Sequence, residues 1–348
     1  MLSALYRSLL RPLLFRADPE LVHDAVILAA RAAQRVPGAC GLAGLAAGAP
    51  ELPTTFSGLR FPNPVGLAAG FDKNCEAAAF LSRLGFGFLE LGTVTLRPQP
   101  GNPKPRLFRL PEQQAILNRM GFNNIGAEAA ARKLERLLPL PIPVGISIGK
   151  NADCPLENAP ENYLGAFEAL YDLGDYFAVN ISSPNTAQLR TLHGADKLRP
   201  LVEPLLAFAA GRKRPKPVFV KIAPDLDEES LRAVCGLAAE LRFGLIAANT
   251  TLSRSGLPER WRDEKGGLSG RPVKKLSNEI LVRAAELTGG RVPIMASGGV
   301  FTGEDALEKL RLGAGLVQVY TGLVYGGPLL PREIVEYLRR STWEPKQP

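Results

Sequence analysis

The sequence predicts an α/β fold in which eight strand–helix units follow an N-terminal helical extension. From about residue 60 onward, short apolar segments alternate with segments of helical periodicity, and there are eight such pairs. Uninterrupted apolar strands that alternate with helices indicate a parallel sheet covered on both faces, and eight units close it into a (β/α)8 TIM barrel. The length of 348 residues accommodates one barrel of roughly 250–300 residues together with an extension.

Each predicted strand is a short apolar run followed by Gly, Asn or Ser and then by a helical segment. The eight strands are expected at Val65–Leu67, Phe88–Leu91, Val144–Ile148, Phe177–Ile181, Val218–Ile222, Leu245–Ala248, Val292–Ala296 and Leu316–Tyr320. Residues Asp227–Leu241 and Glu304–Leu312 are examples of the helical patterns between them. The segment Leu96–Asn118 is longer than an ordinary strand-to-helix loop, so it is expected to carry an extra hairpin or a lid over the barrel mouth.

Residues 1–50 form the predicted extension and residues 51–348 the predicted barrel domain. Asp18 is expected to cap a helix that has Pro19 at its first position. This helix has a wide apolar face, which requires burial against the barrel, a partner or lipid. Docking on the barrel and binding at a membrane interface both remain open, with Arg7, Arg11 and Arg16 near anionic headgroups in the second case. The Arg-bearing, acid-free start of the chain is also compatible with a mitochondrial transit peptide.

The composition argues against several classes of function. The 42 Lys and Arg exceed the 34 Asp and Glu by 8 (42 − 34), but the basic residues form no long run with aromatics, so nucleic acid is not an expected partner. His23 and His193 cannot build a three-histidine metal site, the four cysteines form no CxxC pair, and no metal is expected. The isolated cysteines are typical of a reducing compartment. The longest uncharged stretch is too short to cross a membrane.

Small residues follow the last two predicted strands. Gly298 and Gly299 come after the seventh strand, and Thr321 comes after the eighth. Such positions allow backbone N–H groups to approach a phosphate. Because the chain contains neither GxGxxG nor GxxxxGK[ST], a cofactor with one terminal phosphate is favoured over a dinucleotide.

The other strand ends carry amides, hydroxyls and lysines with hardly a carboxylate among them. Such a set suits a planar, anionic, hydrogen-bonding ligand and does not suit glycoside hydrolysis, which needs two facing carboxylates. Lys221 ends a strand that is otherwise apolar, so we expect a buried cation that stabilises negative charge.

Several segments together resemble the dihydroorotate dehydrogenase family, a group of flavin enzymes of pyrimidine biosynthesis. They lie in order between about Phe61 and Tyr325 and read AAGFDKN, GTVTLRPQPGNPKPRLFRLPE, LNRMGFNN, VNISSPNT, VKIAPDL, ANTTLSR, GGLSGRP and LVQVYTG. The extension with RADPELVH is similar to the quinone-dependent class 2 branch, and Ser183 agrees, because class 1 enzymes have Cys at the base position. The resemblance implies FMN as cofactor, dihydroorotate and orotate as substrate and product, and membrane quinone as electron acceptor.

The resemblance also implies roles for individual residues. Oxidation of dihydroorotate removes a proton from C5 and a hydride from C6, with Ser183 as the base and flavin N5 as the hydride acceptor. A serine hydroxyl is a poor base, so its proton must leave through water or neighbouring hydroxyls. The segment Pro184–Gly194 is the expected flexible loop over Ser183, Lys221 is expected beside the flavin N1/O2 edge, and His193 is expected to be structural.

The implied binding residues form three sets. The substrate-binding residues are Lys73, Asn118, Arg119, Met120, Gly121, Phe122, Asn180, Asn185, Asn249 and Thr250. The cofactor-binding residues are Ala69, Gly70, Phe71, Asp72, Lys73, Thr93, Ser147, Asn180, Lys221, Ala248, Gly270, Gly299, Tyr320 and Thr321. The quinone-tunnel residues are His23, Arg109 and Tyr320.

Two positions depart from the family pattern. Ser147 stands where the family usually has Asn, and Ala248 stands where it usually has Thr. Ser147 can still form a hydrogen bond, whereas Ala248 can contribute only its backbone, so flavin contacts are expected to differ at these two places.

Three functional hypotheses follow. The first is a peripheral membrane enzyme on the lipid bilayer surface, at the cytoplasmic face of a bacterial inner membrane or at the mitochondrial inner membrane in a eukaryote. The second is a related enzyme that uses fumarate or NAD and whose extension only docks on the barrel. The third is a barrel without turnover whose extension binds other proteins. A flavin in the purified protein would exclude the third, and the choice of electron acceptor would separate the first two.

Overall fold

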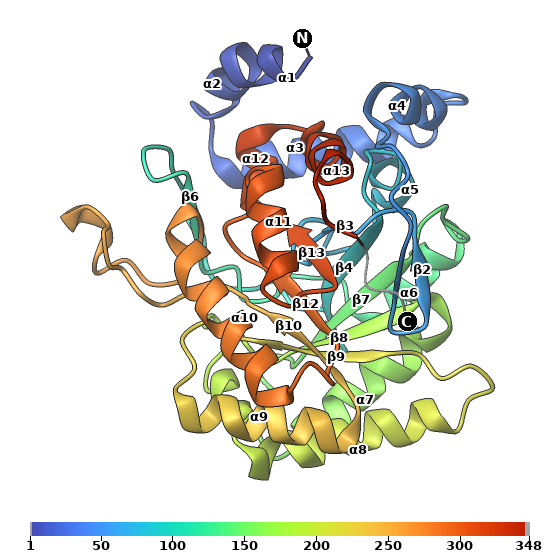
Figure 1. Cartoon of the computed structure of the whole chain (residues 1–348), viewed down its shortest axis with the longest axis vertical. Coiled ribbons are helices and arrows are strands. Elements are labelled where there is room, and N and C mark those ends of the chain that lie inside the picture. Colours follow the sequence, from blue (N-terminus) through green and yellow to red (C-terminus); the bar gives the residue numbers. More distant parts are fainter. Residues whose placement is uncertain (1, 345–348) are drawn as a thin grey trace.

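Eight parallel strands form a closed barrel at the centre of the molecule (Figure 1). The structure, a computed structural model, describes residues 2–344. Met1 and residues 345–348, which the two predicted domain ranges include, lie outside the described residues. The order around the barrel is β10-β12-β13-β3-β4-β7-β8-β9, and every neighbouring pair is parallel. The predicted (β/α)8 barrel is therefore confirmed.

The observed strands follow the predicted ones closely. They are β3 (Val65–Leu67), β4 (Phe88–Thr95), β7 (Val144–Gly149), β8 (Tyr176–Asn180), β9 (Val218–Ile222), β10 (Gly244–Ala247), β12 (Ile294–Ser297) and β13 (Leu316–Val319). The largest difference is that β4 continues to Thr95, because its pairing with β7 resumes after a register shift between Leu91 and Val94. Apolar runs did not predict this part of β4, because it begins with Gly92 and Thr93.

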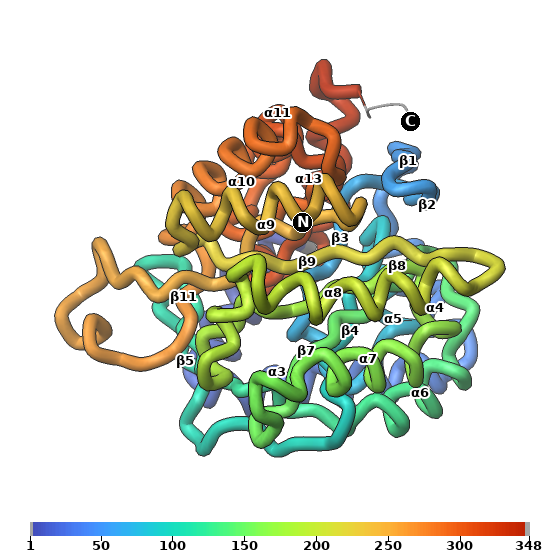
Figure 2. Tube along the Cα trace, turned by 90° about the horizontal axis from the view of Figure 1, so that it is seen from below, coloured from blue at the N-terminus to red at the C-terminus, as the bar shows by residue number. Residues whose placement is uncertain are grey.

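Helices surround the barrel and pack against their neighbours in sequence order, α6 on α7, α7 on α8, α8 on α9 and α9 on α10 (Figure 2). The helices after β3 are α5 (Ala78–Leu81), α6 (Ala127–Glu135), α7 (Ala159–Leu170), α8 (Ala195–Ala210), α9 (Glu228–Leu241), α10 (Lys274–Thr288), α11 (Gly303–Arg311), α12 (Thr321–Gly326) and α13 (Leu330–Arg340). Short 3-10 turns are η2 (Tyr171–Leu173), η3 (Leu189–His193), η4 (Glu259–Trp261) and η5 (Arg271–Val273). Asp227 caps α9 and Thr302 caps α11 through their side chains, which confirms the two helices named from the sequence.

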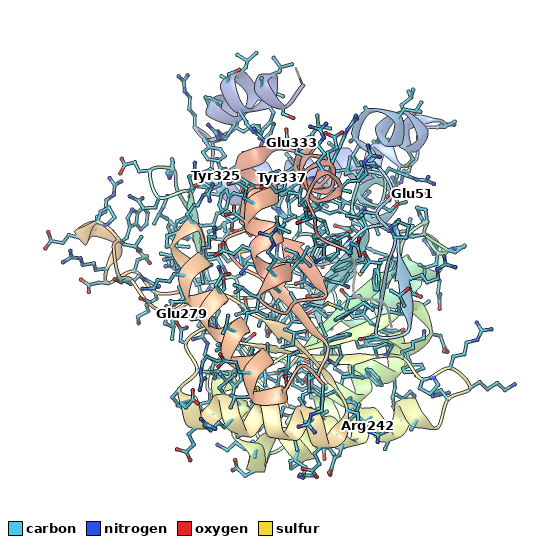
Figure 3. All side chains as sticks on the ribbon, viewed as in Figure 1. Glu51, Arg242, Glu279, Tyr325, Glu333 and Tyr337 are labelled. Atoms are coloured by element: carbon cyan, nitrogen blue, oxygen red, sulfur yellow. The ribbon has the colours of Figure 1, made fainter. Side chains whose placement is uncertain are left out.

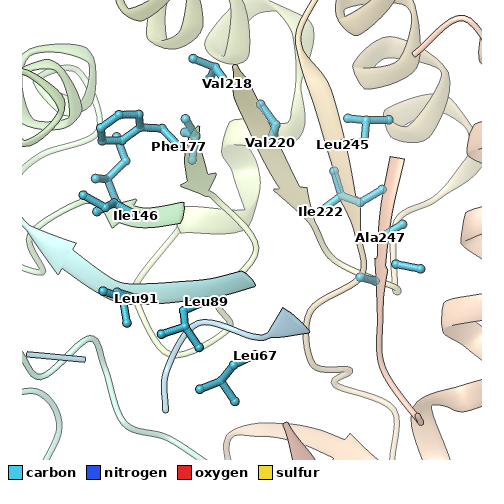
Figure 4. Packing of buried hydrophobic residues seen from close by; sticks show 14 of the residues in the cluster. Leu67, Leu89, Leu91, Ile146, Phe177, Val218, Val220, Ile222, Leu245 and Ala247 are labelled. Atoms are coloured by element: carbon cyan, nitrogen blue, oxygen red, sulfur yellow. The ribbon is translucent and has the colours of Figure 1, made fainter. Parts of the chain in front are cut away.

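Side chains of the strands alternate between two hydrophobic layers. Leu89, Leu91, Val218 and Val220 point outward into the layer between the strands and the helices, as Figure 4 shows for the central strands. Inward-pointing residues fill one end of the barrel interior: Phe88, Tyr176, Ala178, Phe219, Ile246, Met295 and Leu316. Phe61 of the preceding segment packs with them. Since successive residues of a strand face opposite sides, one strand supplies both layers.

A short antiparallel hairpin packs against the inner layer. It consists of β1 (Thr54–Phe56) and β2 (Leu59–Phe61), and the sequence analysis did not predict it. Phe56 stacks on Phe219 with ring centroids 5.9 Å apart. Aromatic packing therefore fills the barrel from the end at which its strands begin.

A second, three-stranded sheet contains the hairpin expected between Leu96 and Asn118. Its strands are β5 (Leu107–Leu110), β6 (Ala115–Asn118) and β11 (Gly267–Gly270), in the order β11-β6-β5 and all antiparallel. The third strand was not predicted, because it comes from the loop after β10, about 150 residues later in the chain. Such a pairing leaves no local signal in the sequence.

The extension consists of α1 (Leu2–Leu5), a π-helical turn η1 (Tyr6–Leu10), α2 (Arg11–Leu14), α3 (Pro19–Ala33) and α4 (Ala39–Ala47). These elements lie together at one end of the molecule (Figure 1). Asp18 accepts hydrogen bonds from Glu20 N and Leu21 N, both at 2.9 Å, so the predicted cap of α3 is confirmed.

Polar contacts tie the first helices to α12 and α13. Tyr6 Oη donates to Val324 O (2.8 Å), Arg11 donates to Tyr325 O (3.1 Å), and Arg7 pairs with Glu333 (2.5 Å). Tyr325 and Glu333 are labelled beneath these helices in Figure 3. Both side chains therefore contact the barrel domain, and their place near headgroups stays a prediction.

Large exposed apolar side chains concentrate on the extension. Apart from Leu252 and Tyr337, all those in the described part of the chain lie between residues 5 and 45: Leu5, Leu9, Leu10, Leu13, Leu21, Val26, Leu28, Val36, Leu42 and Leu45. Leu42 is 69% exposed and Leu45 is 82% exposed. No helix among residues 2–344 has both the length and the apolar character to cross a membrane.

A buried ion pair anchors α3 to the loop before β5. Arg106 donates to the Glu20 carboxylate at 2.8 and 3.2 Å and also to Pro100 O and Asn102 O. Both side chains are less than 9% exposed. Burial alone would raise the pKa of Glu20, but Arg106 and Lys104 outweigh it and hold that pKa below its usual value. The pair thus stabilises the fold above the titration range of a free Glu, and this contribution disappears as the pH falls through the lowered pKa.

We predict that Arg106→Met lowers the free energy of unfolding by about 3–5 kcal/mol, because it leaves Glu20 buried without its main partner. Urea unfolding at neutral pH measures the loss. The matched control is the double variant Glu20→Met with Arg106→Met, which should recover much of the stability. An equal loss in the single and double variants would contradict this account.

Candidate active site

A cavity opens at the end of the barrel where the strands finish. The loops after β3, β8, β10, β12 and β13 reach it, as do Thr93 of β4, Lys221 of β9, and β6 and β11 of the three-stranded sheet. Because the other end of the barrel is filled with aromatic side chains, polar loop residues can converge around an open space only at this mouth.

Most of the residues named from the sequence line this cavity. They are Ala69, Gly70, Lys73, Thr93, Asn118, Met120, Gly121, Phe122, Asn180, Ser183, Asn185, Lys221, Ala248, Asn249, Thr250, Gly270, Gly299, Tyr320 and Thr321. The named residues that do not line it are Phe71, Asp72, Arg119, Ser147, His23 and Arg109.

Three of the named residues outside the lining form hydrogen bonds or ion pairs with other residues of the barrel domain. Asp72 accepts from Glu76 N and Ala77 N at 2.8 Å, and burial raises its pKa. Arg119 pairs with Glu264 and lies over the Phe108 ring. Ser147 is fully buried, and its Oγ lies 2.9 Å from Thr93 Oγ1, so its contact with the cavity passes through Thr93.

Asparagine side chains form two connected pairs in the cavity wall. Asn185 Nδ2 donates to Asn118 Oδ1 at 3.2 Å, and Asn249 Nδ2 donates to Asn180 Oδ1 at 3.3 Å. Asn180 in turn donates to Thr93 Oγ1 at 3.0 Å. Asn123, which the sequence analysis missed, also lines the cavity, and its Oδ1 has no hydrogen-bond partner among the described residues. These amides offer donors and acceptors to a planar ligand.

Ser183 lies at the edge of this amide cluster. It is 6% exposed, and its Oγ accepts from Asn185 N at 3.2 Å. Three residues later, the hydroxyl of Thr186 is buried and has no partner among the described residues. Ser183 thus places a buried hydroxyl in the cavity wall, and the same loop carries a second buried hydroxyl, that of Thr186, outside the lining.

Arg190 braces the loop that carries Ser183, a role that the sequence analysis missed. Its guanidinium donates to Ser182 O (2.9 Å) and Thr250 O (2.8 Å) and pairs with Asp225 (2.7 Å). The expected flexible segment Pro184–Gly194 contains η3, in which the side chains of Leu189, Leu192 and His193 are buried. Packing and the guanidinium therefore both hold this loop.

Lys221 belongs to a buried network below the cavity. Its Nζ pairs with Glu90 Oε1 at 3.0 Å, while Gln318 Nε2 and Tyr176 Oη donate to Glu90 Oε2 at 2.6 and 3.3 Å. Glu90 is fully buried and does not line the cavity. The described residues that line the cavity include no carboxylate, which confirms the expectation for the strand ends, whereas the partner of Lys221 was not predicted. The sequence concealed Glu90 because it lies within an apolar strand that the analysis treated as entirely core.

Lys73 brings a second amine to the cavity. Burial lowers its pKa to about 8, although Asp24 and Glu20 act in the opposite direction. Lys73 also lines a second hollow, beneath α3, together with His23 and Phe71. The amine therefore lies at the junction between the barrel mouth and the extension.

The loops after β12 and β13 form the small-residue end of the cavity. Gly298 and Gly299 adopt φ values of 99° and 74°, which side-chain-bearing residues rarely adopt. A Cβ on Gly299 would lie 2.4 Å from the Cβ of Lys274. Thr321 Oγ1 lies 2.8 Å from Ser269 Oγ. The peptide groups and hydroxyls that line the cavity at this end fit a phosphate.

Aromatic contacts connect the extension to the cavity. The His23 ring meets Phe71 edge-on at 5.2 Å, and Phe71 meets Tyr320 at 5.9 Å. Burial lowers the pKa of His23 to about 3, so its imidazole is neutral at physiological pH. Arg109 lies apart from this series, over the Phe15 ring at 4.7 Å, and donates to Leu14 O.

Metal chemistry has no visible centre in residues 2–344. No group of three or more His, Cys, Asp or Glu side chains in this part of the chain could hold an ion. The cavity instead combines amides, hydroxyls, two lysines and glycine-rich loops.

Comparison with known proteins identifies the family. The dihydroorotate dehydrogenase family model matches residues 51–341. A dihydroorotate dehydrogenase (quinone) from Acidithiobacillus ferrooxidans is 49% identical over 346 residues, which cover 95% of this chain and 94% of the relative. A protein of the same name from Thermosynechococcus vestitus is 48% identical and covers 96% of each chain.

Solved structures agree with these sequence relatives. Ligand-free DHODH from Eimeria tenella superposes with a TM-score of 0.85 at 40% identity, covering 92% of this chain and 94% of that chain. The complex of the same enzyme with ferulenol gives a TM-score of 0.84 at 39% identity. The similarity to the quinone enzymes extends over almost the full length of the chain, and the chain belongs to the dihydroorotate dehydrogenase (quinone) family.

Proposed function

We propose that the cavity binds FMN and dihydroorotate side by side, and that Ser183 is the base in the quinone-dependent oxidation of dihydroorotate to orotate, a step of pyrimidine biosynthesis. The observation that carries this proposal is a single continuous cavity lined by Ser183, the asparagine pairs, Lys221 and the Gly298–Gly299 loop. This set combines a base, a planar-ligand cage, a cation and a phosphate cradle.

The proposed FMN site follows the wall from β3 to β13. Lys221, Asn180 and Thr93 would hold the ring system, and the loops at Gly299 and Thr321 would hold the phosphate. When bound, FMN supplies a two-electron acceptor that takes hydride from substrate C6 and passes electrons on to quinone. Ser147 would act through Thr93, to which it is hydrogen bonded, and Ala248 would offer only its backbone.

The proposed substrate site combines Lys73 with the asparagine pairs. An ammonium group suits the substrate carboxylate, and the amides suit the ring N–H and C=O groups. Ser183 Oγ accepts the C5 proton in this proposal, and its own proton must leave at the same time because a neutral hydroxyl is a weak base. The buried hydroxyl of Thr186 supports a proton relay through water at this point.

We further propose that the extension binds the surface of a membrane and delivers quinone toward Tyr320. The exposed leucines of residues 5–45 support the membrane contact, because a large apolar patch at a protein surface marks an interaction site. The series His23, Phe71 and Tyr320 supports an apolar route into the barrel mouth. For a bacterial chain, the surface would be the cytoplasmic face of the inner membrane.

The flavin assignment predicts that denaturing the purified full-length protein releases FMN in near-equimolar amount, because the cavity offers one phosphate cradle. Chromatography of the released flavin against FMN, FAD and riboflavin standards measures the outcome. FAD, or no flavin at all, would exclude the proposal.

The base assignment predicts that Ser183→Ala slows reduction of the flavin by dihydroorotate about 10²–10⁴-fold, the usual contribution of a general base. Stopped-flow absorbance at the flavin band measures this rate, and flavin content should equal that of the wild type. Thr191→Ala is the matched control, because it removes an exposed hydroxyl from the same loop, and it should leave the rate of flavin reduction at the wild-type value. Reduction of Ser183→Ala at the wild-type rate would refute the role.

The membrane assignment predicts that a variant with Leu9, Leu13, Leu42 and Leu45 all changed to Ser loses binding to anionic lipid vesicles and turnover with long-chain quinone. Burial of each leucine contributes about 1.5–3 kcal/mol at most. Dihydroorotate should still reduce the flavin of this variant. Leu252→Ser, at a 51% exposed position on the barrel domain, is the control. Unchanged vesicle binding would instead favour a protein partner or no partner for this surface.

A further inference from the structure

Lys309 is a fully buried lysine outside the cavity, between α11 and α10. Its Nζ donates to Ser277 Oγ and to Asn278 Oδ1, both at 2.8 Å, and the residue is 0% exposed. No carboxylate oxygen of the described residues lies within 4.0 Å of Lys309 Nζ. Asp305 and Glu308 pair with Lys274 instead. An ammonium group in this position lacks the usual compensation for burial.

Ser277 connects this lysine to the phosphate end of the cavity. Its Oγ lies 3.1 Å from Gly298 O and 2.9 Å from Lys274 O. The peptide group between Gly298 and Gly299 is trans, so the N–H of Gly299 points away from the carbonyl that faces Ser277. The ammonium, the hydroxyl and this peptide group thus form a series that leads from Lys309 to a residue in the cavity lining.

We propose that Lys309 is a positioning residue for the phosphate of the flavin, acting through Ser277 and the Gly298–Gly299 peptide. The inference rests on the proposed function, since it assumes that FMN binds with its phosphate at this loop. Hydrogen bonds in series polarise one another in a protein interior, and the cation at one end favours an anion at the other. A phosphate, with a charge of about −1.5 to −2 at pH 7, supplies the missing compensation.

The environment of Lys309 also changes the pKa of its amine. Burial lowers the pKa of Lys309 to about 7, while Glu308 and Asp305 act in the opposite direction and Lys274 reinforces the lowering. A nearby anion would favour the charged form of the amine. The free energy of phosphate binding and that of holding this proton are therefore coupled.

The test compares the affinities of FMN and riboflavin, which differ only in the phosphate. The full-length protein is first freed of bound flavin, and equilibrium binding of each flavin is then followed by quenching of its fluorescence. Lys309→Met should weaken FMN binding roughly tenfold or more, the effect of one charge across several ångströms of protein, and leave riboflavin binding unchanged. Ser277→Ala should produce a smaller loss in the same direction, because it interrupts the series and keeps the cation.

Lys275→Met is the matched control. It also removes one lysine charge, but from a side chain on α10 that is 87% exposed. It should leave the affinities for FMN and riboflavin at their wild-type values. Adding inorganic phosphate with riboflavin tests whether a free anion occupies the same cradle, and it should strengthen riboflavin binding to the wild type more than to Lys309→Met.

Two results would overturn the inference in different ways. Equal losses of FMN and riboflavin affinity in Lys309→Met would show that the lysine only supports the packing of α10 on α11. A wild-type protein that binds both flavins equally would refute the phosphate site, and the proposed function would fail at that point irrespective of Lys309.

Discussion

The alternation of side chains along eight short parallel strands is the constraint on which the rest of this structure depends. Outward residues such as Leu89 and Val220 bind the helices, and inward residues such as Phe88 and Phe219 fill the barrel from the end where the strands begin. The β1–β2 hairpin packs against that filling. Open space is left at the opposite mouth, where strand ends from all around the barrel place their loops within reach of one ligand.

Charged side chains in and around the cavity are held by hydrogen-bond and ion-pair partners in the surrounding structure. Glu90 holds Lys221 beneath the cavity, Arg190 joins the loop of Ser183 to the loop of Thr250, and Ser277 connects Lys309 to Gly298. In each case the charged group donates hydrogen bonds to fixed protein groups. Arg190 thereby holds the two loops that carry Ser183 and Thr250 in the cavity wall.

The extension combines two kinds of surface. Its inner side combines the buried apolar residues Ile27, Ala30 and Ala47 with two ion pairs, Glu20 with Arg106 and Arg7 with Glu333. Its outer side exposes leucines such as Leu42 and Leu45. A helical segment that only covered the barrel would bury nearly all of its large apolar side chains, whereas here several leucines remain exposed. This division agrees with membership in a quinone-dependent family.

The sequence by itself determined the barrel, the cap of α3 and most of the cavity lining, because hydrophobic period, helix caps and strand-end residues are local properties of the chain. Only the tertiary structure decided that Glu90 pairs with Lys221, that β11 joins β6, that Arg7 and Arg11 turn toward the barrel domain, and that Asp72 and Arg119 lie outside the cavity. These facts depend on residues far apart in the chain. Whether a charged side chain is a ligand group, a cap or a counter-ion is set by the partner that folding brings to it, and no local pattern encodes that partner.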